Sequence, residues 1–319
     1  MQFTEKKRTF VTKIEMKEPR LQYYSLGEDV TAFSTSRSGG YSEGRYGEFN
    51  INRYCGDSEE AISQNREALC RLLGIDDDRL LMPHQVHQTE IAVVDEDLLK
   101  LSAEEQVQRL EGVDALMTNV RGVCIGVSTA DCIPVLLCDP VRHAVCAIHA
   151  GWRGTVMRIV EKAVAEMTAV YGTCPADIMA QIGPGIHLDS FEVGDEVYDA
   201  FAHEGFPMER ISKKYLMDKS GSRSNLFALL AKKLFTFHSI PEQSSPTRSL
   251  SLLPSKWHID LPECNRLQLL TAGLRADRIA VSPVCTYQQS DTFFSARRLG
   301  IDSGRIYTGI LLHQSTKTL

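Results

Sequence analysis

Two histidines and one cysteine in this chain have the side-chain chemistry to bind a metal ion: His87, Cys132 and His149. Each lies at the edge of a run of apolar residues typical of a strand, beside residues typical of turns. Zinc binds imidazole nitrogen and thiolate sulfur together, and three protein ligands leave a fourth position for water. A zinc-bound water is acidic enough to attack carbon near neutral pH. Because the three residues are far apart in the sequence, spacing alone does not specify a site, and packing in the core is the alternative.

Two neighbours of this trio also carry chemistry. Asp131 directly precedes Cys132, where it could orient a ligand or act as a general base; the alternative is a polar residue of a turn at a strand end. His84 forms a His-x-x-His pattern with His87. On a strand these two side chains would point to opposite faces, so we do not expect them to bind one ion together.

Arginines at two places suggest anion binding. Arg153 stands where a long helix is expected to begin, and the free N–H groups and dipole of a helix start favour phosphate. Arg297 and Arg298 form a second basic pair. The alternative for each arginine is an ion pair on the surface.

The cysteines offer a third chemistry, nucleophilic catalysis, which needs a thiol of lowered pKa and a histidine partner. Metal binding would exclude that role for Cys132, and Cys285 lies in an apolar run that suggests the core. The chain has nine cysteines. Their number is odd, their spacing is irregular and no Cys-x-x-Cys occurs, so a disulfide framework is not expected.

The elements that must position these residues are short strands and helices. Four apolar runs bounded by Gly, Asp or Pro predict buried strands; they cover residues 113–117, 122–128, 133–138 and 144–149. One long helix is predicted over 156–170, with Arg153 at its start and Gly172 at its end. Further helices are predicted over 58–73, with Ser58 as N-cap, over 194–203, and after Asp260. The alternation predicts a mixed α/β chain.

Residues 211–256 differ in character from the rest. Proline and serine make up eight of the fifteen residues from 241 to 255, a composition typical of a loose loop. Leucines between 226 and 237 predict one amphipathic helix before it. We interpret 211–256 as an insertion carrying a single helix.

Composition restricts the class of protein. The 319 residues are 43% hydrophobic and 24% charged, enough for a sizeable core. The longest apolar run, 132–138, is far too short for a membrane helix, so no membrane association is expected. The charged first residues lack the apolar segment of a signal peptide, which predicts a cytoplasmic protein. A net charge of −6 argues against nucleic acid as a partner.

Twelve short motifs, taken together in order, resemble a known family. They are FSTSRSGGYSEG, FNINRYCGD, HQVHQTE, VDALMT, TADCIPVLL, HAGWRG, IGPGI, FEVGDEV, KWHIDL, NRLQLL, VCTY and FFSARR. The chain resembles the laccase-domain family, once labelled multicopper polyphenol oxidoreductases. Its members are described as zinc-dependent purine nucleoside phosphorylases with adenosine deaminase and methylthioadenosine phosphorylase activity, and a bacterial branch as peptidoglycan editing factors. The resemblance covers roughly residues 30–210 and 257–312.

The resemblance implies a fold and a site. It implies an α+β fold, a single domain over 1–319 with mixed β-sheets covered by helices. It implies that His87, Cys132 and His149 are zinc ligands. Two departures stand out: the segment 211–256 is longer than is usual in the family, and Pro262 stands where a tryptophan is common.

The resemblance also implies an activity, phosphorolysis of a purine nucleoside by phosphate, together with deamination of adenosine. We assign anion binding to Arg153, with Arg298 as a second candidate, and proton transfer to Asp131. Multicopper sites draw on repeated His-x-His pairs, and none of the nine histidines forms one, so zinc is expected rather than copper. The alternatives are an enzyme that edits UDP-muramyl precursors of peptidoglycan and a binding protein in which zinc is structural.

Overall fold

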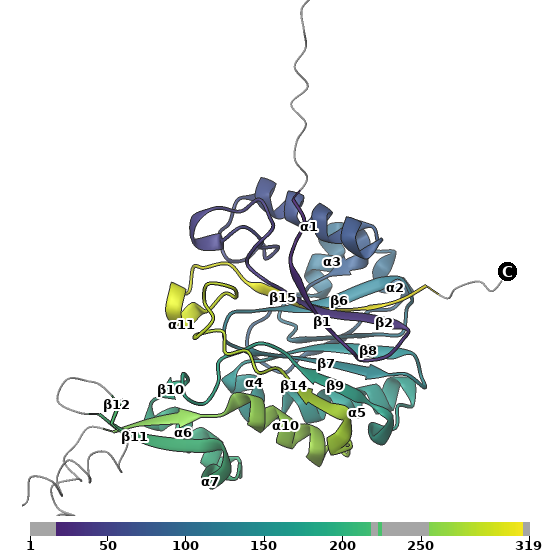
Figure 1. Ribbon diagram of the computed structural model, residues 1–319. Coiled ribbons are helices and arrows are strands. Elements are labelled where there is room, and N and C mark those ends of the chain that lie inside the picture. Colours follow the sequence, from purple (N-terminus) through teal and green to yellow (C-terminus); the bar gives the residue numbers. More distant parts are fainter. Residues whose placement is uncertain (1–16, 218–222, 225–254, 315–319) are drawn as a thin grey trace, which may run out of the picture.

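Two β-sheets form the centre of the molecule (Figure 1). The computed structural model describes residues 17–217, 223–224 and 255–314. The five-stranded sheet has the order β1 (Leu21–Tyr24), β2 (Val30–Thr35), β15 (Ile306–Leu312), β6 (Val123–Thr129), β3 (Leu80–Leu81). The six-stranded sheet has the order β14 (Ile279–Val281), β9 (Met179–Ile182), β7 (Ile133–Asp139), β8 (Ala144–Ala150), β5 (Ala115–Thr118), β4 (Ile91–Val93). Each sheet contains both parallel and antiparallel pairs, so the predicted mixed α/β fold is confirmed.

The two sheets pack face to face and helices cover their outer faces (Figure 1). Between the sheets lie apolar side chains of both, among them Ile125 of β6 and Leu136 of β7. Helix α1 (Glu59–Leu73) packs on the outer face of the five-stranded sheet through Leu69. Helices α5 (Ile159–Tyr171) and α10 (Leu261–Thr271) cover the outer face of the six-stranded sheet. Because the central strands of both sheets are buried on both faces, β5, β6, β7 and β8 are largely apolar runs.

The predicted strands and helix ends agree with the structure at most positions. The four apolar runs form β5, β6, β7 and β8, all fully buried. Ser58 accepts a hydrogen bond from the backbone of Ala61 as the N-cap of α1, and Gly74 ends that helix in the left-handed conformation. Asp260 caps α10. Helix α6 (Asp195–His203) follows Gly194 as expected.

The prediction of one long helix over 156–170, beginning near Arg153, is wrong in one respect. The structure divides this stretch into two helices. Helix α4 (Trp152–Val156) ends at Met157, Arg158 is left-handed with φ 63°, and α5 then begins. Buried Gln268 of α10 accepts from the backbone N–H of Val160 at 3.3 Å and donates to the carbonyl of Thr155 at 2.9 Å. A side chain from a distant part of the sequence therefore gives the N–H of Val160, in the first turn of α5, a partner and links it to the last turn of α4.

A third sheet stands beside the body of the molecule (Figure 1). Its order is β10 (Glu192–Val193), β13 (Ser255–Ile259), β11 (Ser212–Met217), β12 (Arg223–Ser224). The two ends of the predicted insertion 211–256 are therefore strands, since β11 pairs with β13. The helix predicted over 226–237 lies outside the described residues. The single domain over 1–319 stays a prediction.

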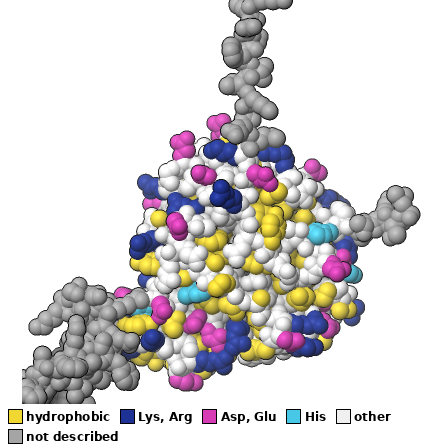
Figure 2. Space-filling view, in the orientation of Figure 1, with side chains coloured by type: hydrophobic (Ala, Val, Ile, Leu, Met, Phe, Trp, Pro, Cys, Tyr) yellow, Lys and Arg dark blue, Asp and Glu magenta, His cyan; other side chains and the backbone are white. Residues whose placement is uncertain are grey.

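The remaining described α-helices are short. They are α2 (Glu96–Leu99), α3 (Ala103–Arg109), α7 (Met208–Ile211) and α11 (Ala296–Leu299). No described helix has the length and apolar character needed to cross a membrane. On the face seen in Figure 2, basic and acidic side chains are interspersed.

Candidate functional site

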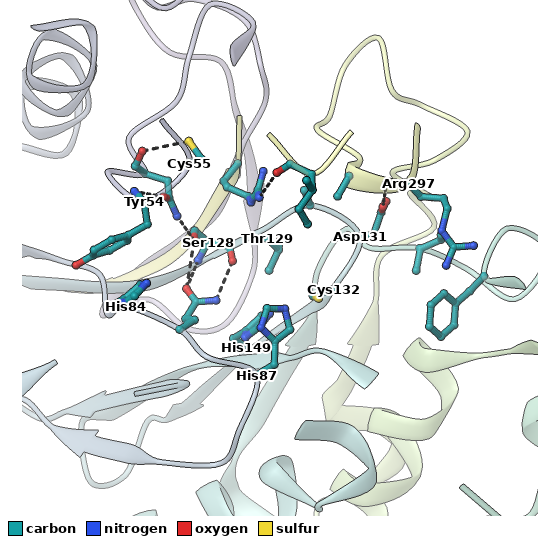
Figure 3. A pocket seen from close by; sticks show the side chains of 18 residues that line it. Tyr54, Cys55, His84, His87, Ser128, Thr129, Asp131, Cys132, His149 and Arg297 are labelled. Carbon is teal, nitrogen blue, oxygen red and sulfur yellow. Dashed lines mark hydrogen bonds between the residues drawn. The ribbon is translucent and has the colours of Figure 1, made fainter. Parts of the chain in front are cut away.

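The structure brings His87, Cys132 and His149 together at one end of the two central sheets (Figure 3). One potential ligand atom from each of the three lies within 4.8 Å of the others. His149 is in β8, Cys132 lies just before β7, and His87 lies in the loop before β4. Among the described residues, no other group of three His, Cys, Asp or Glu side chains has ligand atoms this close together.

The carboxylate of Asp114, just before β5, holds the imidazole of His149 and the loop of His87 in place. Its Oδ1 accepts from His149 Nδ1 at 2.7 Å, so the other ring nitrogen of His149 is directed toward the trio. The same carboxylate accepts from the backbone N–H groups of His87 at 3.0 Å and Gln88 at 2.7 Å. Asp114 is completely buried. It therefore fixes the ring orientation of one histidine and the loop that carries the other.

A glycine packs against the trio. A Cβ at Gly151 would lie 3.0 Å from His87 Cδ2 and 3.2 Å from Cys132 Sγ. A larger residue at 151 would have to displace a potential ligand. The absence of a side chain at Gly151 thus lets the three ligand residues approach one another.

Electrostatics in the trio favour a thiolate. Burial alone would raise the pKa of Cys132, but the nearby imidazoles of His149 and His87 lower it to about 6. Burial alone would lower the pKa of His149, but Cys132 and Asp114 raise it to about 9. Without a metal these groups form a thiolate–imidazolium pair. A bound metal cation would take the place of the imidazolium proton.

Asp131 has a structural environment that does not leave its carboxylate free. It lies in the short link between β6 of one sheet and β7 of the other, and its φ of 87° makes the sharp turn there. One oxygen accepts from Thr286 Oγ1 and the other from the backbone N–H of Arg297, both at 2.7 Å. Asp131 therefore ties the loop of Cys132 to the C-terminal part of the chain.

A cavity of about 560 Å³ opens over the trio. Its lining includes all three potential ligands, Asp131, and residues that come from both central sheets and the loops beside them. In Figure 3, Tyr54 and His84 lie on one side of the trio and Arg297 on the other. The volume is that of a small-molecule site.

Of the arginines predicted to bind anions, neither Arg153 nor Arg298 lines this cavity. The guanidinium of Arg153 lies over the ring of Trp152, 4.3 Å from its centroid. That of Arg298 donates to Tyr287 OH. Arg297 and Arg305 line the cavity instead. In the sequence, Arg297 stands out only as the neighbour of Arg298, and no motif singles out Arg305.

Asp114 is a further functional residue that was not predicted, although the sequence contains a signal for it. Asp114 is the one charged residue at the start of an otherwise apolar run, and a buried carboxylate there requires partners. All nine cysteines are free thiols in the structure, and Cys285 is buried.

A family model described as multi-copper polyphenol oxidoreductase laccase matches residues 31–237 and 230–313. A protein of Bacteroides thetaiotaomicron named purine nucleoside phosphorylase is 40% identical over 92% of this chain and 96% of its own length. A protein of an unidentified prokaryote, named adenosine deaminase RL5, is 40% identical over 91% of this chain and 97% of its own.

A solved structure has the same fold. The crystal structure of the Bacillus licheniformis hypothetical protein YfiH superimposes with a TM-score of 0.75 at 27% identity, over 93% of this chain and 98% of that one. The similarity therefore spans nearly the whole length of both proteins.

Proposed function

The chain belongs to the multi-copper polyphenol oxidoreductase laccase family. Within this family, we propose that it is a zinc-dependent purine nucleoside phosphorylase. The reaction replaces the bond between purine and ribose by a bond between phosphate and ribose. The observation that carries the proposal is the His87–Cys132–His149 trio on the wall of a cavity of about 560 Å³. The name of the Bacteroides relative, 40% identical over 92% of this chain, supports the same reaction.

The donor set of the trio fits zinc. Two imidazoles and one thiolate are borderline and soft ligands, as zinc prefers, and the depressed pKa of Cys132 makes the thiolate available. When bound there, zinc would supply a Lewis acid that polarises a group of the substrate. A structural zinc is normally closed by four protein ligands. The open side of a three-residue set facing a cavity favours a catalytic role.

Copper chemistry of the multicopper kind has less support. It requires several ions held by repeated His-x-His pairs, and the sequence has none. The described residues contain a single group suited to one ion. The residues therefore favour one zinc site over an electron-transfer cluster, despite the name of the family.

The cavity wall beside Asp131 is suited to the phosphate. The guanidinium of Arg297 lies on this side, opposite Tyr54 and His84 (Figure 3). Its side chain donates to the carbonyl of Glu192 at 3.0 Å, which orients it, and Asp131 accepts from its backbone N–H. We assign anion binding to Arg297, in place of Arg153 and Arg298. Asp131 positions this wall.

Deamination of adenosine is a second candidate activity of the same site. The relative named adenosine deaminase RL5, 40% identical to this chain, supports it. A metal-activated water is the usual nucleophile in such a reaction. Both activities would use one trio and one cavity, so they would be lost together on removal of a ligand.

The test is a product assay with metal analysis. Purified protein is incubated with inosine, adenosine or a UDP-muramyl precursor, with and without phosphate, and its zinc and copper content is measured. We expect hypoxanthine and ribose 1-phosphate from inosine only when phosphate is present, about one zinc per chain, and loss of both zinc and turnover in Cys132→Ala. His143→Ala is the control, because His143 is exposed at the opposite end of β8. Full turnover by metal-free Cys132→Ala, or reaction with the muramyl precursor alone, contradicts the proposal.

A further inference from the structure

The cavity contains a histidine that the metal site does not use. His84 lines the same wall as Tyr54, and 35% of its side chain is exposed. Its Nδ1 lies 2.6 Å from Glu111 Oε1. The ring stacks on Tyr54 with a centroid distance of 4.0 Å and an interplanar angle of 26°. A carboxylate on one edge and an aromatic ring on one face together fix the orientation of the imidazole.

Backbone hydrogen bonds also hold His84 and Glu111 side by side. His84 and Glu111 form a parallel β-bridge. The N–H of His84 donates to the carbonyl of Leu110, and the N–H of Gly112 donates to the carbonyl of His84, both at 3.0 Å. The imidazole and the carboxylate are therefore neighbours by backbone register. A surface ion pair between two long side chains lacks such support.

The other proton-exchanging groups of the cavity are occupied or poorly suited. Both oxygens of Asp131 accept hydrogen bonds. Burial raises the pKa of Tyr54 and of Cys55 above their ordinary values, so both stay protonated at neutral pH. His87, Cys132 and His149 form the trio. Among the described residues that line the cavity, this leaves the imidazole of His84 as the side chain placed to give a proton to the substrate and to take one back.

We propose that His84 is the general acid that protonates the leaving purine, with Glu111 as its positioning residue. The proposal rests on the phosphorylase function argued above. Hydrogen phosphate dianion attacks the anomeric carbon of the ribose, the carbon–nitrogen bond breaks, and its electron pair goes to the purine. The His84 imidazolium gives its proton to a purine nitrogen, and the ribose 1-phosphate monoanion returns one proton to the imidazole. Atoms and charge balance, and no other reactant is needed.

The surroundings of His84 agree with this role. A carboxylate on Nδ1 stabilises the imidazolium and leaves Nε2 as the edge for the substrate. Three charged or titratable groups surround the imidazole of His84. They are the carboxylate of Glu111, the phenol of Tyr54 and, beside that phenol, Arg53. The flat Tyr54–His84 surface also suits contact with a purine ring.

The test compares two nucleosides with different leaving groups. Guanosine needs a proton on its leaving base, whereas 7-methylguanosine carries a fixed positive charge on the imidazole ring and leaves without one. We expect His84→Gln to lose about 10²- to 10⁴-fold in kcat on guanosine, the usual contribution of a general acid. The loss on 7-methylguanosine should be below about tenfold. Zinc content should equal that of the wild type.

A second variant tests the same role without replacing His84, in case His84→Gln does not fold. Glu111 is 55% exposed, so Glu111→Gln is expected to fold and to lose part of the guanosine rate while keeping the rate on 7-methylguanosine. The alkaline limb of the pH–kcat profile, where the acid loses its proton, should flatten in His84→Gln. His143→Gln is the matched control and should leave both substrates and the profile unchanged.

The outcomes separate the two proposals. If the zinc-loaded wild type cleaves neither nucleoside, the phosphorylase function is wrong and the role of His84 with it. If the wild type cleaves both but His84→Gln loses equally on both, or on neither, the phosphorylase function stands and His84 is not the acid.

Discussion

Asp114 and His149 are joined by two hydrogen bonds, one between their side chains and one between their backbones. Asp114 Oδ1 accepts from His149 Nδ1 at 2.7 Å, and the carbonyl of Asp114 accepts from the backbone N–H of His149 at 2.8 Å. The pair lies across the antiparallel strands β5 and β8 and is buried. Since the same carboxylate also fixes the backbone of His87, one residue sets the geometry of two of the three potential ligands.

Asp114→Asn should weaken metal binding without removing a ligand. The amide cannot accept from all of its present donors, so the ring of His149 and the loop of His87 lose their fixed orientation. We expect zinc affinity, measured by competition with a chelator, to fall about 10- to 100-fold. Asp139→Asn, at the far end of β7, is the matched buried control. An unchanged affinity in Asp114→Asn would show that the trio is positioned by other contacts.

Gly151→Ala tests the close packing behind the trio. The added methyl group would lie 3.0 Å from His87 Cδ2 and 3.2 Å from Cys132 Sγ, closer than carbon and sulfur approach without strain. Because the backbone of Gly151 has an ordinary φ of −66°, the effect is steric and local. We expect at least about a tenfold loss of zinc affinity with little change in melting temperature. Full zinc binding in this variant would mean that the trio moves freely.

Much of this site could be predicted from the sequence, because residues at the ends of predicted strands lie at the end of a sheet. Apolar runs predicted β6, β7 and β8, so Cys132 and His149 were expected at strand ends, and the family resemblance linked them to His87. The choice between Arg297 and Arg298 could not be made in this way. Adjacent residues on a helix point about 100° apart, and only the packing of α11 decides which one faces the cavity.

Other features depend on contacts between distant segments. Residues 152–171 contain no proline, so nothing local predicts the break at Arg158. The break accompanies hydrogen bonds from Gln268, more than a hundred positions away. The acid–base role predicted for Asp131 rested on its place beside Cys132, whereas its partners Thr286 and Arg297 come from the C-terminal part of the chain.

Asp131→Asn separates a positioning role from proton transfer. An amide cannot accept from both Thr286 and the backbone N–H of Arg297 in the present geometry, so the wall that carries Arg297 loosens. We expect KM for phosphate to rise about tenfold, the effect of roughly 1.4 kcal/mol, while the pH–kcat profile keeps its shape. Loss of one limb of that profile would instead assign proton transfer to Asp131.

Arg297→Met and Arg153→Met compare the two candidate anion sites directly. Arg297 lines the cavity and Arg153 does not, so the first variant should raise KM for phosphate by about tenfold or more, as expected for loss of a charge-assisted hydrogen bond. The second should leave it unchanged. Methionine keeps most of the length of the side chain and removes the guanidinium, with its charge and its hydrogen-bond donors. The reverse result would return the anion site to the start of α4.

The stability of the protein should depend on pH through Glu263 of α10. Its carboxylate receives two hydrogen bonds from Arg266, at 2.7 and 3.1 Å, and forms an ion pair with Arg210 of α7 at 2.7 Å. Burial alone would raise the pKa of Glu263, but these two guanidiniums lower it below its ordinary value of 4.5. A carboxyl group with a lowered pKa stabilises the folded state above its unfolded pKa, and this contribution is lost as the pH falls through the folded pKa.

Glu263→Gln should therefore reduce the free energy of unfolding by about 1 kcal/mol at pH 7. The difference from the wild type should shrink below pH 4.5 and vanish once the wild-type carboxyl is protonated. Urea unfolding at several pH values measures it. The exposed pair of Arg275 and Asp277 provides the control, since solvent screens it, and Asp277→Asn should show no comparable difference. A Glu263→Gln deficit that stays constant down to pH 3 would assign the effect to packing of the side chain, because only a charge interaction disappears with the proton.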